Sequence, residues 1–290
     1  MLRFAYNTNG CQNHRLTDAI ELIARAGYQG VALTLDWHHL DPFASDWAYQ
    51  TRRVARQLGD AGLGCVIETG ARYLLRSTEK HEPTLINPHP EGRQLRIEFL
   101  KRAVDIAGLL DAETVSFWAG EKQHSVSDAE AWLYLRDGVG TLLHYATARN
   151  VTLSMEPEPG HWIETNADWE SFRNQFPKGG RLKLALDVGH VWVTGEMDPA
   201  ESILQFQNHL GTVAIEGMNR GVHVHLPLHE GNMELAPVLK NLQRIDYQKL
   251  LCVELSRESH RAHRAIPESI ETLRNFQLTG IIDHKLTQLE

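Results

Sequence analysis

Short apolar runs alternate with longer amphipathic segments from one end of the chain to the other. Eight of these runs have the length of buried strands: Arg3–Asn7, Gly30–Leu35, Gly64–Glu68, Thr114–Trp118, Val151–Glu156, Leu182–Asp187, Thr212–Met218 and Leu250–Leu255. Such alternation is typical of βαβ units and a parallel sheet. Eight is also the number of strands that a closed (β/α)8 barrel requires.

The segments between the predicted strands carry apolar residues at three- and four-residue spacing, which predicts helices. The clearest are Thr17–Ala26, Asp46–Ala61, Arg93–Leu110, Asp128–Arg149 and Leu235–Leu242. No linker rich in Pro, Gly or Ser interrupts the alternation. We therefore expect an α/β fold in which residues 1–290 form a single (β/α)8 barrel. An open doubly wound sheet has the same alternation, so the residues at the strand ends must distinguish the two.

Carboxylates stand at the ends of three of the later predicted strands. Glu156 and Asp187 each close a strand, and Glu254 lies near the end of the last one. In a barrel, the carboxyl ends of all strands meet at one mouth. Carboxylates that share a partly desolvated cavity repel one another, and a cation compensates for that repulsion. The alternative for each acid taken alone is a solvated side chain at a strand end.

Histidines lie close to these acids in the sequence. His190 follows Asp187 in Asp-Val-Gly-His, and His223 and His225 occupy alternate positions of an extended segment, so they point the same way. Mixed carboxylate and imidazole ligands suit transition metals better than Ca2+. The alternative is that a chain with 16 histidines simply carries some of them on its surface. We predict one divalent metal, Mn2+, Zn2+, Co2+ or Mg2+, with these candidate ligands: Glu156, Asp187, His190, His223, His225 and Glu254.

The strand-end motifs resemble those of a known family. The segments Met-Glu156-Pro-Glu-Pro-Gly, Leu-Asp187-Val-Gly-His190, His-Val-His225 and Val-Glu254-Leu are similar to the xylose isomerase-like TIM barrels, which include sugar isomerases, epimerases and apurinic endonucleases. The resemblance covers nearly the whole chain. It implies that Glu156 and Glu254 bind the metal, flank the substrate and form the catalytic acid/base pair. It also implies that Asp187 is a metal ligand and that His190 contacts the substrate or a further metal.

The seventh predicted strand departs from the family pattern, in which this strand delivers a histidine ligand. If Thr-Val-Ala214-Ile-Glu-Gly-Met is the strand, Ala214 stands where the histidine is expected, and His223 and His225 belong to the following loop. If Val-His-Val-His is the strand, His225 is itself the ligand. The run from His225 through Pro227 into Glu-Gly-Asn favours the first assignment. That assignment leaves the fourth ligand open.

Other residues that follow predicted strands are candidates for substrate binding: His38, His39, Glu68, Arg72, Trp118 and Glu158. Trp118 either offers an aromatic face to a sugar ring or packs the barrel top. Arg72 either holds a phosphate or carboxylate through two hydrogen bonds or pairs with Glu68. The basic segment Arg257–Arg264 fits an anion site and a solvated helix face equally well. The irregular segment Arg76–Glu91 is either a wall over the barrel mouth or a surface loop.

Net charge and cysteine content indicate which partners and which cellular compartment to expect. The formal net charge is −8, whereas nucleic-acid binding draws its affinity from clustered Lys and Arg, so we expect a small-molecule substrate and no nucleic acid. The cysteines Cys11, Cys65 and Cys252 show no C-x-x-C spacing, which favours reduced, buried thiols in a cytoplasmic protein. No signal-peptide pattern or membrane-length apolar run is apparent, so no membrane association is expected. The family resemblance makes a homodimer or homotetramer the expected assembly.

These observations predict a metal-dependent isomerase or epimerase that moves a proton next to the carbonyl of a keto-sugar, a cyclitol or a related polyhydroxy compound. A lyase or dehydratase on the same substrates is an alternative. A metal-dependent endonuclease is another, and against it stand the net charge and Trp118, which occupies a strand end where such a site needs an imidazole. The last alternative is a non-catalytic metabolite-binding barrel, if Ala214 means that metal affinity has been lost.

Overall fold

Eight parallel strands close into a barrel in the computed structural model, which describes residues 1–176 and 182–282. The order around the ring is β1-β10-β7-β6-β5-β4-β3-β2, so neighbours in sequence are neighbours in space. The expected (β/α)8 barrel is therefore confirmed, and the open sheet is excluded. The strands are β1 (Arg3–Asn7), β2 (Gly30–Thr34), β3 (Gly64–Glu68), β4 (Val115–Trp118), β5 (Leu153–Glu156), β6 (Leu182–Asp187), β7 (Leu210–Ile215) and β10 (Leu250–Val253).

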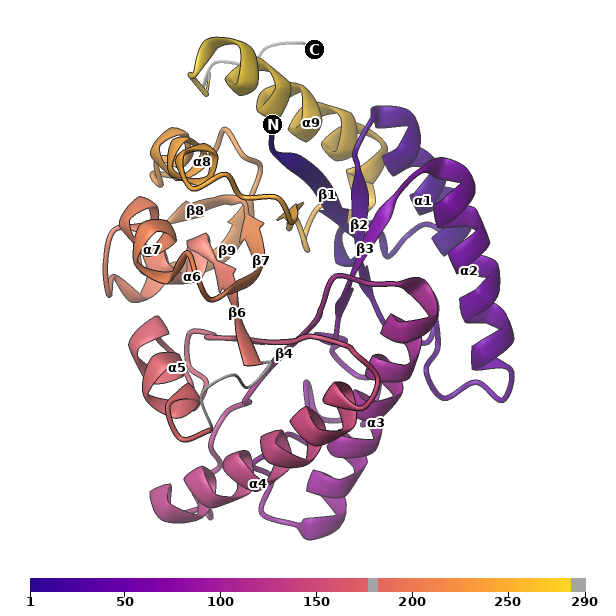
Figure 1. The fold of residues 1–290 in the computed structure, drawn as a ribbon, viewed down its shortest axis with the longest axis vertical. Helices are drawn as coiled ribbons and strands as arrows, with labels where there is room; N and C mark the ends of the chain where they lie inside the picture. Colours follow the sequence, from indigo (N-terminus) through magenta and orange to yellow (C-terminus); the bar gives the residue numbers. More distant parts are fainter. Residues whose placement is uncertain (177–181, 283–290) are drawn as a thin grey trace.

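Helices surround this ring of strands (Figure 1). They are α1 (Leu16–Ala26), α2 (Trp47–Ala61), α3 (Pro90–Leu110), α4 (Asp128–Thr147), α5 (Asn166–Arg173), α6 (Val188–Thr194), α7 (Pro199–Phe206), α8 (Leu235–Arg244) and α9 (Ala262–Thr279). Two short 3-10 turns, η1 (Thr8–Cys11) and η2 (Ser259–Arg261), follow β1 and β10. Local chemistry fixes the helix ends: Ser127 and Glu130 form a capping box at the start of α4. No helix in the described ranges is long and apolar enough to cross a bilayer.

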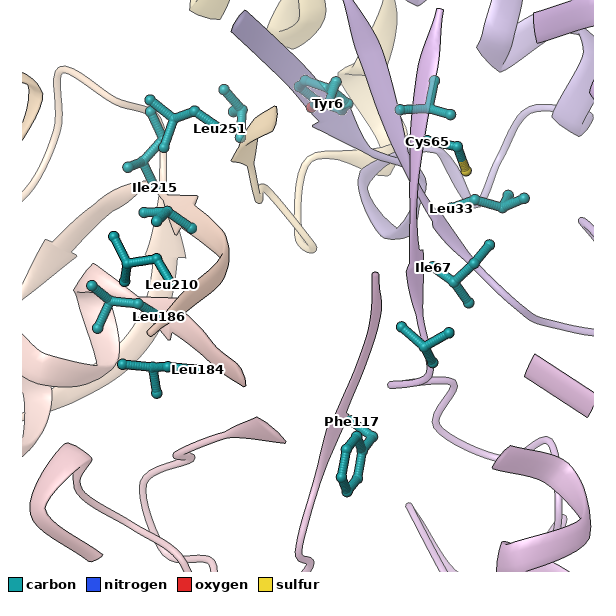
Figure 2. Close-up of a cluster of buried hydrophobic side chains, with 14 of the residues drawn as sticks. Tyr6, Leu33, Cys65, Ile67, Phe117, Leu184, Leu186, Leu210, Ile215 and Leu251 are labelled. Carbon is teal, nitrogen blue, oxygen red and sulfur yellow. The ribbon is translucent and has the colours of Figure 1, made fainter. Parts of the chain in front are cut away.

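The core has two layers because strand side chains alternate between the inside and the outside of the barrel. Large apolar side chains such as Ile67, Phe117 and Leu186 point away from the centre of the ring, toward the helices (Figure 2). Burial of each such side chain contributes roughly 1.5–3 kcal/mol, so this outer layer is the main source of stability. A smaller inner cluster fills the barrel itself: Ala5, Ala32, Val66, Leu250 and Cys252. The three cysteines are buried and unpaired, as predicted.

The same alternation positions the site. Two residues beyond the inward-facing Ala5, Val66 and Cys252 come Asn7, Glu68 and Glu254. These polar residues therefore also face inward, one layer higher, where the strands end. The barrel thus collects acidic and amide side chains from the ends of different strands at one mouth.

A hairpin replaces the end of the expected seventh strand. The prediction Thr212–Met218 is too long, because β7 ends at Ile215, and residues Gly217–Asn219 (β8) pair antiparallel with Val222–Leu226 (β9). Gly217 is required here, since a Cβ atom would lie 2.1 Å from the carbonyl oxygen of Pro227. The hairpin places the two histidines of β9 beside the barrel mouth, as the first of the two sequence assignments requires.

Candidate active site

Three strand-end acids meet at the barrel mouth. Glu156 ends β5, Asp187 ends β6, and Glu254 follows β10. Each offers a carboxylate oxygen, and these oxygens lie within 4.8 Å of one another. Asp187 is only 2% exposed. The residues that the sequence analysis named as metal-binding acids are therefore brought together.

His225 lies where the seventh strand lacks a histidine. Ala214 is the register partner of Asp187, and its methyl side chain has no donor atom with which to bind a metal. His225 on β9 instead forms a potential ligand group with Asp187 and Glu216, whose donor atoms lie within 4.8 Å of one another. The Nδ1 atom of His225 lies 3.2 Å from the carbonyl oxygen of Glu254, to which it donates when protonated. That hydrogen bond leaves Nε2 as the ligand atom.

His190 and His223 complete a cluster of three imidazoles with His225, again with ligand atoms within 4.8 Å. His190 lies in the first turn of α6 and is 4% exposed. Its Nδ1 atom is 3.0 Å from the carbonyl oxygen of Pro157, and its Nε2 atom is 3.7 Å from Asp187 Oδ2. His223 is more exposed, and its Nε2 atom lies 3.9 Å from a Glu158 oxygen.

Glu216 is a site residue that the sequence analysis did not propose. It directly follows β7, is fully buried, and has no well-formed hydrogen bond to either carboxylate oxygen within the described ranges. Asp187 Oδ2 and His190 Nε2 also lack hydrogen-bond partners in the same part of the chain. Buried polar atoms without partners are costly, and a bound cation satisfies several of them at once. The donor set therefore fits a divalent metal.

The pKa shifts in the cluster also favour a bound cation. Burial raises the pKa of Glu156 well above its usual range, and the nearby Glu158 carboxylate raises it further. Burial and the charge of Asp187 raise the pKa of Glu216 in the same manner. Burial opposes the charged imidazole of His190, but Asp187 and Glu158 outweigh it and raise its pKa. The site thus holds more buried acid than its own imidazoles neutralise.

A cavity of about 190 Å³ opens above the cluster, roughly the volume of six liquid water molecules. Four of the six residues predicted to bind substrate line it, namely Glu68, Arg72, Trp118 and Glu158. The ion pair between Arg72 and Glu68 that the sequence allowed is not formed. Trp118 lines the cavity and also packs between His81 and His161, with ring centroids 5.1 Å and 5.0 Å away.

His38 and His39 are not among the residues that line this cavity. Their rings stack on each other with centroids 4.3 Å apart, and His39 Nε2 lies 3.1 Å from the carbonyl oxygen of His14. The turn that begins at Asp36 holds them there, because Asp36 accepts hydrogen bonds from the backbone N–H groups of Trp37 and His39. Nearness to a strand end in sequence therefore did not bring these two side chains to the mouth.

Asn9 was also missed by the sequence analysis. Its side-chain Nδ2 donates to Glu254 Oε1 at 2.8 Å, and its side-chain Oδ1 is buried without a partner in the described ranges. Asn9 lies on η1, directly after β1, where Asn7 accepts its backbone N–H. The amide therefore orients Glu254 and leaves one acceptor for a ligand.

The irregular segment after β3 forms a wall of the cavity, since Lys80 and His81 line it. Buried Arg96 on α3 anchors this wall: its Nε donates to the carbonyl oxygen of Pro83 at 2.7 Å and its guanidinium to that of His81 at 2.6 Å. The backbone N–H of His81 donates to the carbonyl oxygen of Arg72 at 2.6 Å. The segment is thus fixed to the barrel at several points.

Replacing Arg96 with Met is expected to lower the free energy of unfolding by about 3 kcal/mol, because the carbonyls of His81 and Pro83 lose charge-assisted donors in a buried setting. Unfolding in urea, followed by tryptophan fluorescence, measures the change. The matched control is Arg76→Met, since Arg76 is exposed and its ion pair in the described part of the chain is with Glu79, three residues away. Equal midpoints for the two variants would contradict the anchoring role.

Comparisons with known proteins agree with this architecture. The model of the xylose isomerase-like TIM barrel family matches residues 20–276, so the chain belongs to that family. This confirms the resemblance drawn from the sequence motifs. A search of curated protein sequences finds no match.

Solved structures share the fold over nearly their whole length. An L-ribulose 3-epimerase is 18% identical over 97% of this chain and 96% of that chain, with a TM-score of 0.77. A D-allulose 3-epimerase from Methylomonas sp., in complex with D-allulose, is 18% identical over 94% of this chain and 96% of that chain, with a TM-score of 0.73. A probable 3-DHS dehydratase from Bacillus anthracis is 16% identical over 94% of this chain and 99% of that chain, with a TM-score of 0.75. At these identities the likeness establishes the fold.

Proposed function

We propose that this protein is a divalent-metal-dependent isomerase or epimerase that moves a proton at the carbon next to the carbonyl of a small polyhydroxy compound. One observation carries the proposal. Glu156 and Glu254 come from different parts of the barrel ring, line the same small cavity, and share a potential ligand group with Asp187. Two carboxylates at one cavity provide a base and an acid for proton transfer.

The residues that would hold the metal are Glu156, Asp187, His225 and Glu254, with Glu216, His190 and His223 close by. Oxygen and nitrogen donors in this mixture suit Mn2+, Zn2+, Co2+ or Mg2+. When bound, such a metal polarises the carbonyl and hydroxyl oxygens of the substrate.

The chain's own residues supply the proton transfer. Glu156 is buried, and its raised pKa brings a carboxyl closer to the range in which it both accepts and returns a proton. Glu254 is held in place by the Asn9 amide. We assign the removal of the proton to one of these carboxylates and its return to the other. Return to the opposite face of the carbon gives epimerisation, and return to the neighbouring carbon gives isomerisation.

The solved structures with the same fold support this chemistry without fixing the substrate. Two of them are 3-epimerases, of L-ribulose and D-allulose, and one is a probable 3-DHS dehydratase. Epimerisation at a carbon next to a carbonyl and loss of water beside a carbonyl can both begin with removal of the proton from that carbon. A lyase or dehydratase on the same substrate class is therefore the second candidate.

The test is deuterium exchange from heavy water into a panel of ketoses, keto-sugars and inososes, in the presence of Mn2+ or Zn2+. We expect label at the carbon next to the carbonyl of at least one substrate class, detected by NMR. Label with recovery of the stereoisomer identifies an epimerase, and loss of water identifies a dehydratase. An absence of exchange, together with nicking of a duplex that contains an abasic site, would replace this proposal with the endonuclease.

A further inference from the structure

Three cationic side chains stand on the rim of the substrate cavity. Arg72 and Lys80 belong to the segment after β3, and Arg257 follows β10; all three line the cavity. They are exposed, whereas Asp187 and Glu216 lie buried below. The site is thus acidic at its floor and basic at its rim. The rim is therefore positively charged, although the chain as a whole carries a formal net charge of −8.

None of the three cations has a carboxylate within ion-pair distance in residues 1–176 and 182–282. Arginines nearby on the same segments do find acids: Arg76 pairs with Glu79 at 2.8 Å, and Arg261 with Glu258 at 2.7 Å. Arg72, Lys80 and Arg257 form no ion pair with any described carboxylate. Clustered cations without a counter-charge repel one another, and an anion relieves that repulsion.

The rim is held in position independently of any ligand. The Arg96 hydrogen bonds fix the backbone on either side of Glu82, and the bond from His81 to Arg72 ties the two ends of the cationic segment together. The His81 ring packs against Trp118. Burial lowers the pKa of His81 to about 3, and the charges of Lys80, Arg96 and Arg72 contribute to this shift. His81 is therefore a neutral neighbour of the rim cations.

We infer that the substrate carries an anionic group, a carboxylate or a phosphate, which Arg72, Lys80 and Arg257 bind while its carbonyl end reaches the acids below. This inference rests on the proposed function, according to which the cavity binds the substrate. It narrows the chemical class of that substrate. The cavity of about 190 Å³ limits the ligand to a small molecule. Guanidinium groups bind both kinds of anion through paired hydrogen bonds, so the two sources share one chemistry.

The experiment compares three four-carbon polyols that differ at one end: erythritol is neutral, erythronate carries a carboxylate, and erythritol 4-phosphate carries a phosphate. Each is titrated by calorimetry into the Zn2+-loaded full-length protein. We expect at least one anion to bind about tenfold or more tightly than erythritol, the gain of one charge-assisted contact. The tighter of the two anions identifies the source, and either one supports the inference.

Substitutions of the rim residues then test whether these three cations cause the higher affinity for the anion. Arg72→Gln, Lys80→Gln and Arg257→Gln are each expected to weaken binding of the preferred anion about tenfold and to leave erythritol binding unchanged. Arg76→Gln is the matched control, because it removes the same charge from the same segment at a side chain that does not line the cavity. It is expected to change neither affinity.

Two results of the titration would overturn the inference: anions that bind no better than erythritol, or anions that do not bind measurably. A preference for anions that survives all three rim substitutions would also overturn it, because that preference would come from the metal alone. Failure of the proposed function looks different. If the rim binds anions but no substrate exchanges its proton, the isomerase proposal fails and the anion site stands. If substrates exchange their protons and the rim variants leave the KM of the anionic substrates unchanged, only the anion site fails.

Discussion

Glu156→Gln and Glu254→Gln are each expected to reduce proton exchange at the carbon next to the carbonyl by about a thousandfold or more. An amide cannot act as the base, and general acid–base groups contribute roughly 10²–10⁴-fold to rate. The fold is expected to remain intact, because Gln has nearly the same shape as Glu and removes charge from a crowded set of acids. Exchange from heavy water measures the first effect, and thermal unfolding of the metal-free protein measures the second.

The control for these substitutions is Glu121→Gln, at an exposed position after β4 that does not line the cavity. It is expected to keep the exchange rate of the unaltered protein. Exchange that persists within tenfold in either Glu156→Gln or Glu254→Gln would remove that residue from the acid/base pair. A loss confined to Glu156→Gln would assign both proton steps to Glu156 and leave Glu254 a ligand only.

Removing the metal is expected to stop exchange and to destabilise the fold. If free Mn2+ or Zn2+ exceeds its dissociation constant about a thousandfold, binding stabilises the native state by about 4 kcal/mol. For a chain of this size that corresponds to a rise of about 8 °C in the unfolding midpoint. Dialysis against a chelator followed by scanning calorimetry measures the change. Asp187→Asn is expected to lose most of the metal-dependent rise, since it replaces a proposed ligand that is 2% exposed.

The pH dependence of the metal-free protein provides an independent check. The pKa values of Glu68, Glu156 and Glu216 are raised by burial above the ordinary 4.5 of a glutamate. The folded metal-free protein therefore holds protons that the unfolded chain releases, and its stability is expected to fall as the pH rises above about 5. Metal competes with these protons, so its apparent affinity is expected to rise with pH.

A metal content below roughly a tenth of an equivalent, with no change in the unfolding midpoint on addition of Mn2+ or Zn2+, would contradict the metal-dependent enzyme. The non-catalytic barrel would then be the better description. Chelation that stops exchange without changing the midpoint would place the metal outside the buried acid cluster.

The sequence determined the fold and the three acids because both depend on short-range regularities. The alternation of strands and helices predicted a parallel α/β fold, and the acids at the strand ends favoured a closed barrel over an open sheet. Within a strand, the two-residue period predicts that a polar residue two positions past an inward-facing apolar one lies at the mouth. Asp187 and Glu254 follow this rule, two residues past Ala185 and Cys252, whereas Glu156 keeps the spacing but follows the polar Ser154. The structure brings the three acids together. Glu216 obeys the same two-residue period, counted from Ala214, so a stricter use of the rule would have found it.

Tertiary structure decided the rest, because the deciding contacts join residues far apart in the chain. Only the β8–β9 hairpin shows that His225 lies where Ala214 leaves a gap, since the hairpin folds back over the barrel end. His38 and His39 stay out of the cavity because a local turn directs them toward His14, which no strand-end rule anticipates. The rim also depends on Arg96, a helical residue whose contacts set the path of the loop above the site. Periodicity fixes which way a strand residue points, whereas the position of a loop side chain is set by its three-dimensional neighbours.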